Sequence, residues 1–261
     1  MRTAVRLDIK GGIAEVVLVQ AKRGNPLDEN LCGDLCDVAN ECSENPGVRA
    51  VLIRADGKYF SVGADLKWFG RDRVSLPLML KRANSKLHMA IARFVRADAP
   101  VVIAIHALVV GGMTALTAMA DFALAGTSAK FYAAYNLVGF APDGAGTYFI
   151  PRRVGSRKAA EFLMLNQTWT AEEAARNGLI TRVVPDDRLL EEARSLVEEI
   201  AGGPTITFGE TKRLLMSYTD QPMETQMELE AQAIARCAHT DDCWNAIQAV
   251  MHKKPIEFKG R

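Results

Sequence analysis

The chain has 261 residues, 49% of them apolar, and its 32 basic and 31 acidic side chains leave a formal net charge of +1. This length is sufficient for a substantial hydrophobic core, and the near-neutral charge, with no run of five like charges, provides no general attraction to nucleic acid or to a membrane surface. The longest apolar stretch, around Val101–Val110, is interrupted by His106 and is shorter than the roughly 20 residues that cross a bilayer. The N-terminus runs directly into an alternating apolar and polar pattern, without the apolar core of a signal peptide, so we expect a cytoplasmic protein.

Cysteine usage argues against a metal site. The five cysteines are an odd number, and none forms a paired CxxC motif or lies at zinc-ligand spacing from a histidine. Cys32 and Cys36 stand one helical turn apart, but two sulfur ligands without two further donors make a poor site. We therefore interpret Cys32, Cys36, Cys42, Cys237 and Cys243 as reduced packing or surface thiols.

The first half of the chain alternates strands with helices. Apolar residues at every second position on either side of Gly11-Gly12 indicate a β-hairpin, and apolar residues at every third or fourth position after Pro26 indicate a helix. In chain order, the pattern predicts strands at 5–9 and 13–18, a helix from Pro26 to a stop at Asn45-Pro46-Gly47, a strand at 48–53, a loop at 57–64 and a helix at 78–95 that Pro100 ends.

After Pro100 the predicted elements are short and closely spaced, and the chain then becomes mostly helical. Thr170 with Glu173 fits the N-terminal cap of a helix, which is a structural role for both residues. The order predicts one α/β core followed by a helical C-terminal region, without internal repeats. The elements are strands at 101–105, 121–125 and 179–184, a short strand from Phe131, a turn at 109–112, and helices at 113–119, 158–165, 170–176, 189–200, 205–217 and 223–250.

A pair of glycines marks the first candidate site. Gly111 and Gly112 join a buried strand to a helix, where a backbone N–H at the positive end of the helix can approach a ligand oxygen. This geometry forms one half of an oxyanion hole, although a double glycine at such a place also serves tight packing alone. The segment Phe60–Leu66 follows another strand and offers a second donor, the N–H of Ala64. Together the two segments predict a pair of N–H groups that face a substrate carbonyl.

The order of these motifs resembles one protein family. The segment Phe60–Leu66 has the pattern Phe-Ser-x-Gly-Ala-Asp-Leu, and Pro100–Ile105 leads to the Gly-Gly turn and to a helix ending in Ala-Asp. From the hairpin to Pro255–Phe258, the chain resembles the enoyl-CoA hydratase/isomerase (crotonase) family. The resemblance implies an α/β fold with a crotonase-like spiral of β-β-α units over residues 1–195, followed by a C-terminal helical trimerisation region over residues 196–261.

The same resemblance implies a ligand and its binding residues. The substrate is expected to be an acyl-CoA thioester, so coenzyme A is part of the substrate and no separate cofactor is required. The assembly is expected to be a homotrimer or a dimer of trimers. The thioester oxygen is expected between the N–H groups of Ala64 and Gly112. CoA is expected along Lys58, Ala64, Asp65 and Leu66, with Phe258 and Lys259 reaching the CoA of a neighbouring subunit.

The acidic residues bear on which reaction is expected. Hydratases of the family hold water between two glutamates, but the matching positions here are Ala115 and Tyr135, so two-glutamate hydration is not expected. The segment Val138–Gly146 instead resembles that of the family's enoyl-CoA isomerases, with Asp143 at the place of their single acid/base. One carboxylate suffices to move a proton along an acyl chain. Asp143 also fits a helix cap after Pro142.

The resemblance leaves alternatives to an isomerase. One is an enoyl-CoA hydratase. Another is an aryl-CoA dehalogenase or thioester hydrolase, because related 4-chlorobenzoyl-CoA dehalogenases use an aspartate at the place of Asp143 as nucleophile, assisted by a helix histidine that His88 matches. Against this, Tyr135 replaces their tryptophan. A non-catalytic CoA-binding scaffold is the remaining alternative.

Trp68, Phe69 and the stretch Leu76–Leu80 lie in the segment that shapes acyl pockets in the family, and they suggest an apolar or aryl acyl group. Tyr135 and Phe140 are also expected in the pocket, where Tyr135 can hydrogen-bond Asp143. His106 replaces the family's usual asparagine shortly before the Gly-Gly turn, and we interpret it as a structural residue.

Overall fold

The computed structural model describes residues 2–261, which form two β-sheets and the helices around them. The larger sheet has the order β1-β2-β3-β4-β6-β9; β1 and β2 form the predicted antiparallel hairpin, and the later neighbours are parallel. The smaller sheet has the order β5-β7-β8. The strands are β1 Val5–Lys10, β2 Ile13–Leu18, β3 Ala50–Ala55, β4 Val101–Ile105, β5 Val109–Val110, β6 Phe122–Gly126, β7 Lys130–Tyr132, β8 Thr168–Thr170 and β9 Arg182–Val184.

The chain passes repeatedly from the larger sheet to the smaller one. β4 lies in the larger sheet and β5 in the smaller one, and helix α4 (Gly112–Met119) then leads to β6, after which β7 returns to the smaller sheet. One unit earlier, Ser61 follows β3 and pairs with Val109 of β5 before the chain enters its next helices. This repeated β-β-α order confirms the predicted α/β spiral.

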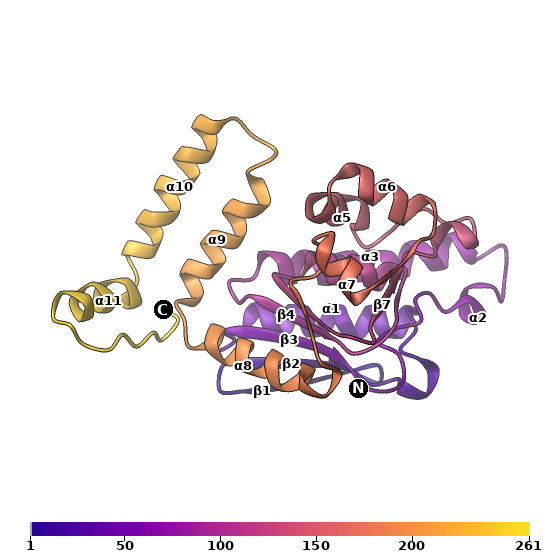
Figure 1. Cartoon of the computed structure of the whole chain (residues 1–261), viewed down its shortest axis with the longest axis horizontal. Coiled ribbons are helices and arrows are strands. Elements are labelled where there is room, and N and C mark those ends of the chain that lie inside the picture. Colours follow the sequence, from indigo (N-terminus) through magenta and orange to yellow (C-terminus); the bar gives the residue numbers. More distant parts are fainter. Residues whose placement is uncertain (1) are drawn as a thin grey trace.

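Helices cover both faces of the larger sheet (Figure 1). Helices α1 and α3 pack together on one face, in the same apolar core as Val51 of β3, whereas α8 packs on the other face with Leu52. Because side chains alternate along a strand, both sides of β3 are buried, which explains its continuous apolar run. The remaining bounds are α1 Glu29–Glu44, α2 Leu66–Phe69, α3 Leu76–Arg96, α5 Gly146–Val154, α6 Ser156–Met164, α7 Ala171–Arg176, α8 Leu189–Ala201, α9 Thr205–Ser217, α10 Met223–Ala238 and α11 Asp241–Met251.

Local capping accounts for the main differences from the predicted elements. The Asp28 carboxylate accepts the Leu31 N–H and begins α1, so Pro26 lies outside the first turn. The predicted helix 223–250 is two helices, because the Thr240 hydroxyl caps α11. The short elements α2, α5 and β8 were not predicted. The predicted N-cap at Thr170 is confirmed at the start of α7, where Thr170 and Glu173 form a capping box.

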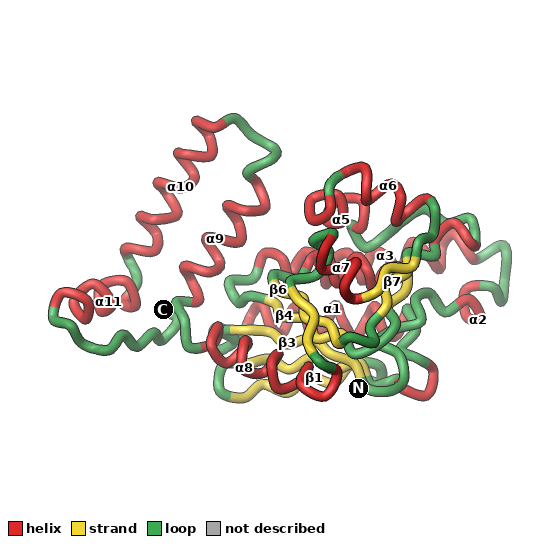
Figure 2. Tube along the Cα trace, in the orientation of Figure 1, coloured by secondary structure: helices red, strands yellow, loops and turns green. Residues whose placement is uncertain are grey.

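The division between core and C-terminal region needs a correction. The expected boundary at residue 195 falls inside α8, which packs along the larger sheet through Ala201. The change of architecture follows α8 instead. Helices α9 to α11 extend from the body as an arm of helices and loops (Figures 1 and 2). Within residues 2–261, we find no helix with the length and apolarity that a membrane span requires.

A buried lysine of α9 attaches the arm to the body. The Lys212 Nζ lies 2.9 Å from the Asp121 carboxylate and donates to the carbonyl oxygens of Phe94 and Ala99 at 3.1 and 3.0 Å. These partners come from α3, from the loop before β4 and from the loop before β6. The arm therefore starts from a position fixed by charge-assisted hydrogen bonds.

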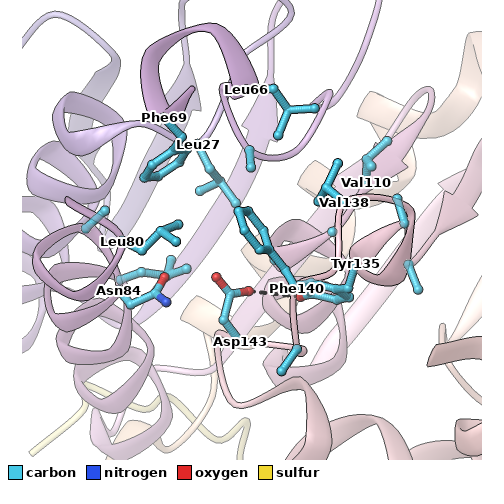
Figure 3. A pocket seen from close by; sticks show the side chains of 18 of the residues that line it. Leu27, Leu66, Phe69, Leu80, Asn84, Val110, Tyr135, Val138, Phe140 and Asp143 are labelled. Atoms are coloured by element: carbon cyan, nitrogen blue, oxygen red, sulfur yellow. Dashed lines mark hydrogen bonds between the residues drawn. The ribbon is translucent and has the colours of Figure 1, made fainter. Parts of the chain in front are cut away.

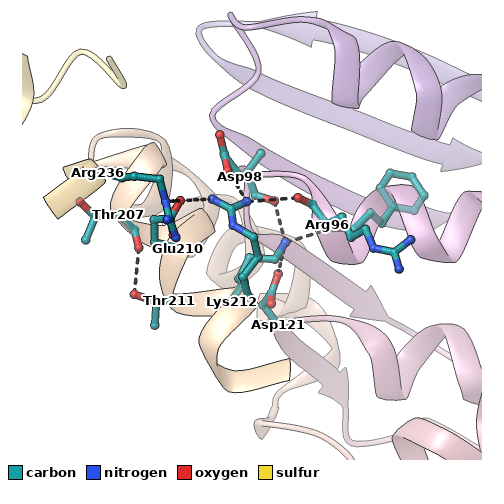
Figure 4. Close-up of polar contacts among 11 residues, drawn as sticks. Arg96, Asp98, Asp121, Thr207, Glu210, Thr211, Lys212 and Arg236 are labelled. Atoms are coloured by element: carbon teal, nitrogen blue, oxygen red, sulfur yellow. Dashed lines mark hydrogen bonds and ion pairs between the residues drawn. The ribbon is translucent and has the colours of Figure 1, made fainter. Parts of the chain in front are cut away.

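A second polar cluster joins α9 to α10. The buried carboxylate of Glu210 accepts hydrogen bonds from Arg236 of α10 and Arg213 of α9 (Figure 4). Arg213 also donates to Asp98 of the body at 2.8 Å. The hydrogen bonds from the two arginines lower the pKa of Glu210 to about 2. The carboxylate therefore stays charged at neutral pH and holds the two helices of the arm together.

Candidate active site

Two loops bring unbonded backbone N–H groups to one cavity. The Leu27 N–H donates to the Gly63 carbonyl and the Asp65 N–H donates to the Leu27 carbonyl, at 2.8 and 2.9 Å, and between them the Ala64 N–H meets no acceptor within residues 2–261. Gly112 is the first residue of α4, where the N–H has no acceptor within the helix. Both Ala64 and Gly112 line the cavity. The predicted pair of donors is thus brought together.

Gly112 lies directly beside Asp143. A Cβ atom at residue 112 would come within 2.9 Å of Asp143 Oδ1 and 2.9 Å of Leu27 Cδ1. Gly111 has a positive φ of 60°, which favours glycine for backbone reasons, whereas Gly112 is required for space. The carboxyl group of Asp143 therefore lies next to one of the two N–H donors, where atoms attached to a bound carbonyl would be placed.

Tyr135 holds the Asp143 carboxyl group. Its hydroxyl donates to Asp143 Oδ1 at 2.9 Å (Figure 3). Burial raises the pKa of Asp143 above the ordinary value for aspartate, and the hydrogen bond from Tyr135 opposes this rise because it stabilises the carboxylate. Burial and the charge of Asp143 raise the pKa of Tyr135 well above its ordinary value, so the phenol keeps its proton. The result is a fixed carboxylate that is a stronger base than an exposed aspartate.

The cavity around Asp143 is largely apolar and has a volume of about 260 Å³. Among the expected pocket residues, Tyr135 and Phe140 line it, together with Asp143 and the two N–H loops. This lining suits an apolar ligand group whose binding displaces water from the cavity, with polar contacts only at the end near Asp143 and the two N–H groups. The apolar side chains labelled around it in Figure 3 are Leu27, Leu66, Phe69, Leu80, Val110, Val138 and Phe140.

The expectation that Trp68 shapes this cavity is corrected. Trp68 does not line it; its neighbour Phe69 does. The two rings pack edge to face with centroids 4.7 Å apart, and the Arg71 guanidinium lies over the Trp68 ring at 4.9 Å. Helix α2 has a single turn, so adjacent residues point in different directions, and only the buried one reaches the cavity.

His88 also lies outside this cavity. It is an exposed residue of α3, and its Nε2 atom accepts the Gly144 N–H at 3.1 Å. An accepting Nε2 carries no proton, so this contact belongs to the neutral imidazole. His88 therefore fixes the loop one residue after Asp143 instead of facing a substrate in the cavity.

The expected CoA segment lies partly at the mouth of the cavity. Ala64, Asp65 and Leu66 line a groove with the basic residues Lys22 and Lys67, whose charges are suited to phosphate groups. The Asp65 carboxylate caps α2 and pairs with Arg23, which also pairs with Asp28 at 2.9 Å. Sequence reasoning did not identify these two lysines, although each lies close to a segment that it considered: Lys22 shortly before Pro26, and Lys67 shortly after Ala64. Lys58 is exposed and lines neither the groove nor the cavity.

The C-terminus lies beside the arm, on the opposite side of the molecule from α2 (Figure 1), and Phe258 and Lys259 belong to the tail that leads to it. The Arg49 guanidinium donates to the Phe258 carbonyl at 3.0 Å, and the Asp242 carboxylate accepts the N–H groups of Lys259 and Gly260. Within one chain, the tail is therefore not brought to the residues that line the cavity.

At two positions, Ala115 and His106, the chain differs from the residue expected for the family, and the structure shows what each side chain contacts. Ala115 is fully buried in α4 and packs where Gly144 and Gly146 approach the helix, so the loop after Asp143 lies directly on it. His106 binds the Gly57 carbonyl through Nε2 at 2.8 Å and joins the loops after β3 and β4. Both observations agree with packing roles.

Two polar side chains that line the cavity, those of Asn84 and Cys32, were given no role there by sequence reasoning. Asn84 projects from α3 into the cavity (Figure 3), and Cys32 lines it from α1. Burial, with a smaller effect of the Asp143 charge, raises the pKa of the Cys32 thiol to about 12, so it stays protonated. The five cysteines are free, and residues 2–261 contain no group of three or more His, Cys, Asp or Glu side chains placed to hold a metal ion.

Two unbonded N–H groups beside a half-buried carboxyl group are the arrangement expected of an enzyme that stabilises negative charge on a carbonyl oxygen while a proton moves nearby. Comparison with protein families makes this class specific. The chain belongs to the enoyl-CoA hydratase/isomerase family, whose model matches residues 8–261. It is therefore a crotonase-family acyl-CoA-processing enzyme, and the predicted family is confirmed.

Similar proteins carry names of both reaction types. The chain is 28% identical to a Rhodobacter capsulatus protein named "Probable enoyl-CoA hydratase", with 98% of each chain covered. It is 25% identical to the 1,2-epoxyphenylacetyl-CoA isomerase of Escherichia coli, with 97% of each covered. The crystal structure of an enoyl-CoA hydratase from Bacillus anthracis matches with a TM-score of 0.92 at 26% identity, covering 99% of this chain and 100% of that one.

Proposed function

We propose that this enzyme is an enoyl-CoA isomerase that moves a double bond along the acyl chain of a CoA thioester. In this reaction the Asp143 carboxylate removes a proton from the carbon next to the thioester. The electron pair moves onto the thioester oxygen, where the N–H groups of Ala64 and Gly112 stabilise the enolate. The protonated Asp143 then returns the proton at the far end of the dienolate, which completes the shift without any net gain or loss of atoms.

The observation that carries this proposal is a single half-buried carboxyl group beside two free N–H donors. No second carboxyl side chain lines the cavity among residues 2–261, since the remaining polar groups there are Asn84, Cys32 and the Tyr135 hydroxyl. One acid/base is sufficient for proton transfer between two carbons, whereas the two-glutamate arrangement that positions water is missing. The thioester itself acidifies the adjacent carbon, so the proposed reaction uses no metal or redox cofactor.

Hydration is the second candidate, because a relative carries that name. The test is to incubate the purified enzyme with a 3-enoyl-CoA, a 2-enoyl-CoA and 4-chlorobenzoyl-CoA and to follow products by chromatography and mass spectrometry. Double-bond migration without a change of mass supports the isomerase. Addition of one water to the 2-enoyl thioester, without isomerisation, would replace the proposal with a hydratase. Loss of chloride or release of free CoA would indicate the dehalogenase or hydrolase reaction, for which His88 is not placed in the cavity.

Removal of the Tyr135 hydroxyl is expected to shift the pH dependence of isomerisation. The carboxylate of Asp143 must be deprotonated to act as a base, so kcat/KM falls as the pH decreases through its pKa. Burial raises this pKa and the Tyr135 hydrogen bond lowers it. In Tyr135→Phe the pKa rises further, and the acidic limb of kcat/KM moves to higher pH. A pH–rate profile with an unchanged acidic limb would show that Tyr135 does not tune the base.

We further propose that the enzyme is a homotrimer or a dimer of trimers. The arm presents large apolar side chains to solvent, including Met227, Ile234, Trp244 and Val250, and these would be covered by neighbouring subunits. Contact of Phe258 or Lys259 with CoA also needs a second chain. Light scattering on the purified protein is expected to give three or six times the chain mass of 28.5 kDa. The mass of one or two chains would contradict this assembly.

A further inference from the structure

One polar side chain of the cavity has no role in the proposed proton transfer. Asn84 is a half-buried residue of α3 whose amide turns into the cavity. In Figure 3, Asn84 and Tyr135 lie on opposite sides of the Asp143 carboxyl group. The Tyr135 hydroxyl donates a hydrogen bond to Asp143, whereas we find no hydrogen bond between the Asn84 amide and another group of the described residues 2–261. Asn84 is therefore a polar, half-buried group in the cavity wall that is available to a bound molecule.

The helix around Asn84 offers no structural reason for an amide. Leu80, Ala83 and Leu87 lie on the same face of α3 and also line the cavity, so Asn84 interrupts an apolar stripe. Asparagine is a poorer helix former than alanine or leucine. A molecule that fills the cavity and excludes water from the Asn84 amide must hydrogen-bond this group, because an amide buried without a partner is unfavourable.

We propose that Asn84 determines specificity by hydrogen-bonding a hydroxyl group on the acyl chain of the substrate. This inference rests on the proposed function for the position of the acyl chain. A side-chain amide both donates and accepts, and a hydroxyl group does the same, so the two satisfy each other. In the proposed reaction the reacting carbons lie against Asp143, so a hydroxyl group that meets α3 belongs to a carbon beyond them; C5 and C6 are the first such positions, and the experiment compares the two.

Binding of unreactive thioesters tests this proposal independently of turnover. Dissociation constants are measured by calorimetry for hexanoyl-CoA, 5-hydroxyhexanoyl-CoA and 6-hydroxyhexanoyl-CoA, with the wild type and with Asn84→Leu. Leucine has nearly the shape of asparagine and is a good helix former. We expect Asn84→Leu to weaken binding of at least one hydroxylated thioester about tenfold, while hexanoyl-CoA binds as tightly as before or more tightly.

A matched control is Ser85→Leu, the next residue on α3, which is exposed to solvent. It adds the same apolar side chain outside the cavity and is expected to leave all three dissociation constants unchanged. Thermal unfolding of both variants checks that α3 remains folded. Equal changes for hydroxylated and plain thioesters in Asn84→Leu would overturn the specificity proposal. Failure of the wild-type enzyme to bind hexanoyl-CoA would instead count against the acyl-CoA site itself. If Ser85→Leu changed the dissociation constants as Asn84→Leu does, the effect would come from a disturbance of α3, and the specificity proposal would be wrong.

Discussion

Replacement of Asp143 by asparagine is expected to lower kcat for double-bond migration by about 10²- to 10⁴-fold, the range typical of losing a general acid/base. Asparagine has almost the same shape as aspartate, and its carbonyl oxygen can still accept the Tyr135 hydroxyl hydrogen bond. The amide cannot take up a proton from carbon. The loss therefore falls on the chemical step, and binding of a saturated acyl-CoA should remain within about threefold of the wild type.

The measurement is steady-state isomerisation of a 3-enoyl-CoA, accompanied by calorimetry with hexanoyl-CoA and by thermal unfolding. Because burial already disfavours the charged form of Asp143, the neutral asparagine should not reduce the unfolding temperature. If Asp143→Asn retained full activity with normal binding, the carboxyl group would be only a loop residue. If activity and hexanoyl-CoA binding were lost together, Asp143 would act on binding and not on proton transfer.

Replacement of Gly112 by alanine is expected to lower kcat/KM by about 100-fold or more, the range found when one oxyanion donor is removed. The new Cβ atom would lie 2.9 Å from both Asp143 Oδ1 and Leu27 Cδ1, so the backbone or the carboxyl group must move. Either movement separates the Gly112 N–H from the base. The two groups that act on the same thioester would then no longer be aligned.

Gly146→Ala is the control for this substitution. Gly146 is also the first residue of a helix beside Asp143, but a Cβ atom there would meet Ala115 at 3.4 Å, an ordinary contact distance. We expect this variant to retain most of its activity, and both variants should unfold at temperatures near that of the wild type. Equal loss in the two variants would attribute the Gly112→Ala effect to general disturbance of the loop. Full activity of Gly112→Ala would exclude a catalytic role for its N–H.

Strong local patterns were sufficient to predict much of the fold. The hairpin around Gly11-Gly12, the buried strand Val101–Ile105 and the Gly-Gly turn into α4 follow from alternation, continuous apolarity and glycine conformation. Caps were harder to place, because Asp28 and Thr240 act through side-chain hydrogen bonds to one or two N–H groups and leave the apolar period unchanged. For this reason a helix start moved, and one predicted helix became two.

By itself, the sequence determined the family, the β-β-α order and the segments that carry Ala64, Gly112 and Asp143, because each depends on neighbouring residues or on a motif. Only the tertiary structure decided which side chains share the cavity. Phe69 rather than Trp68 faces it, Asn84 enters it from α3, and His88, one turn further along, contacts the Gly144 backbone instead. These choices depend on the rotation of each helix and on the path of the loop packed against it, which are set by contacts between residues far apart in the chain.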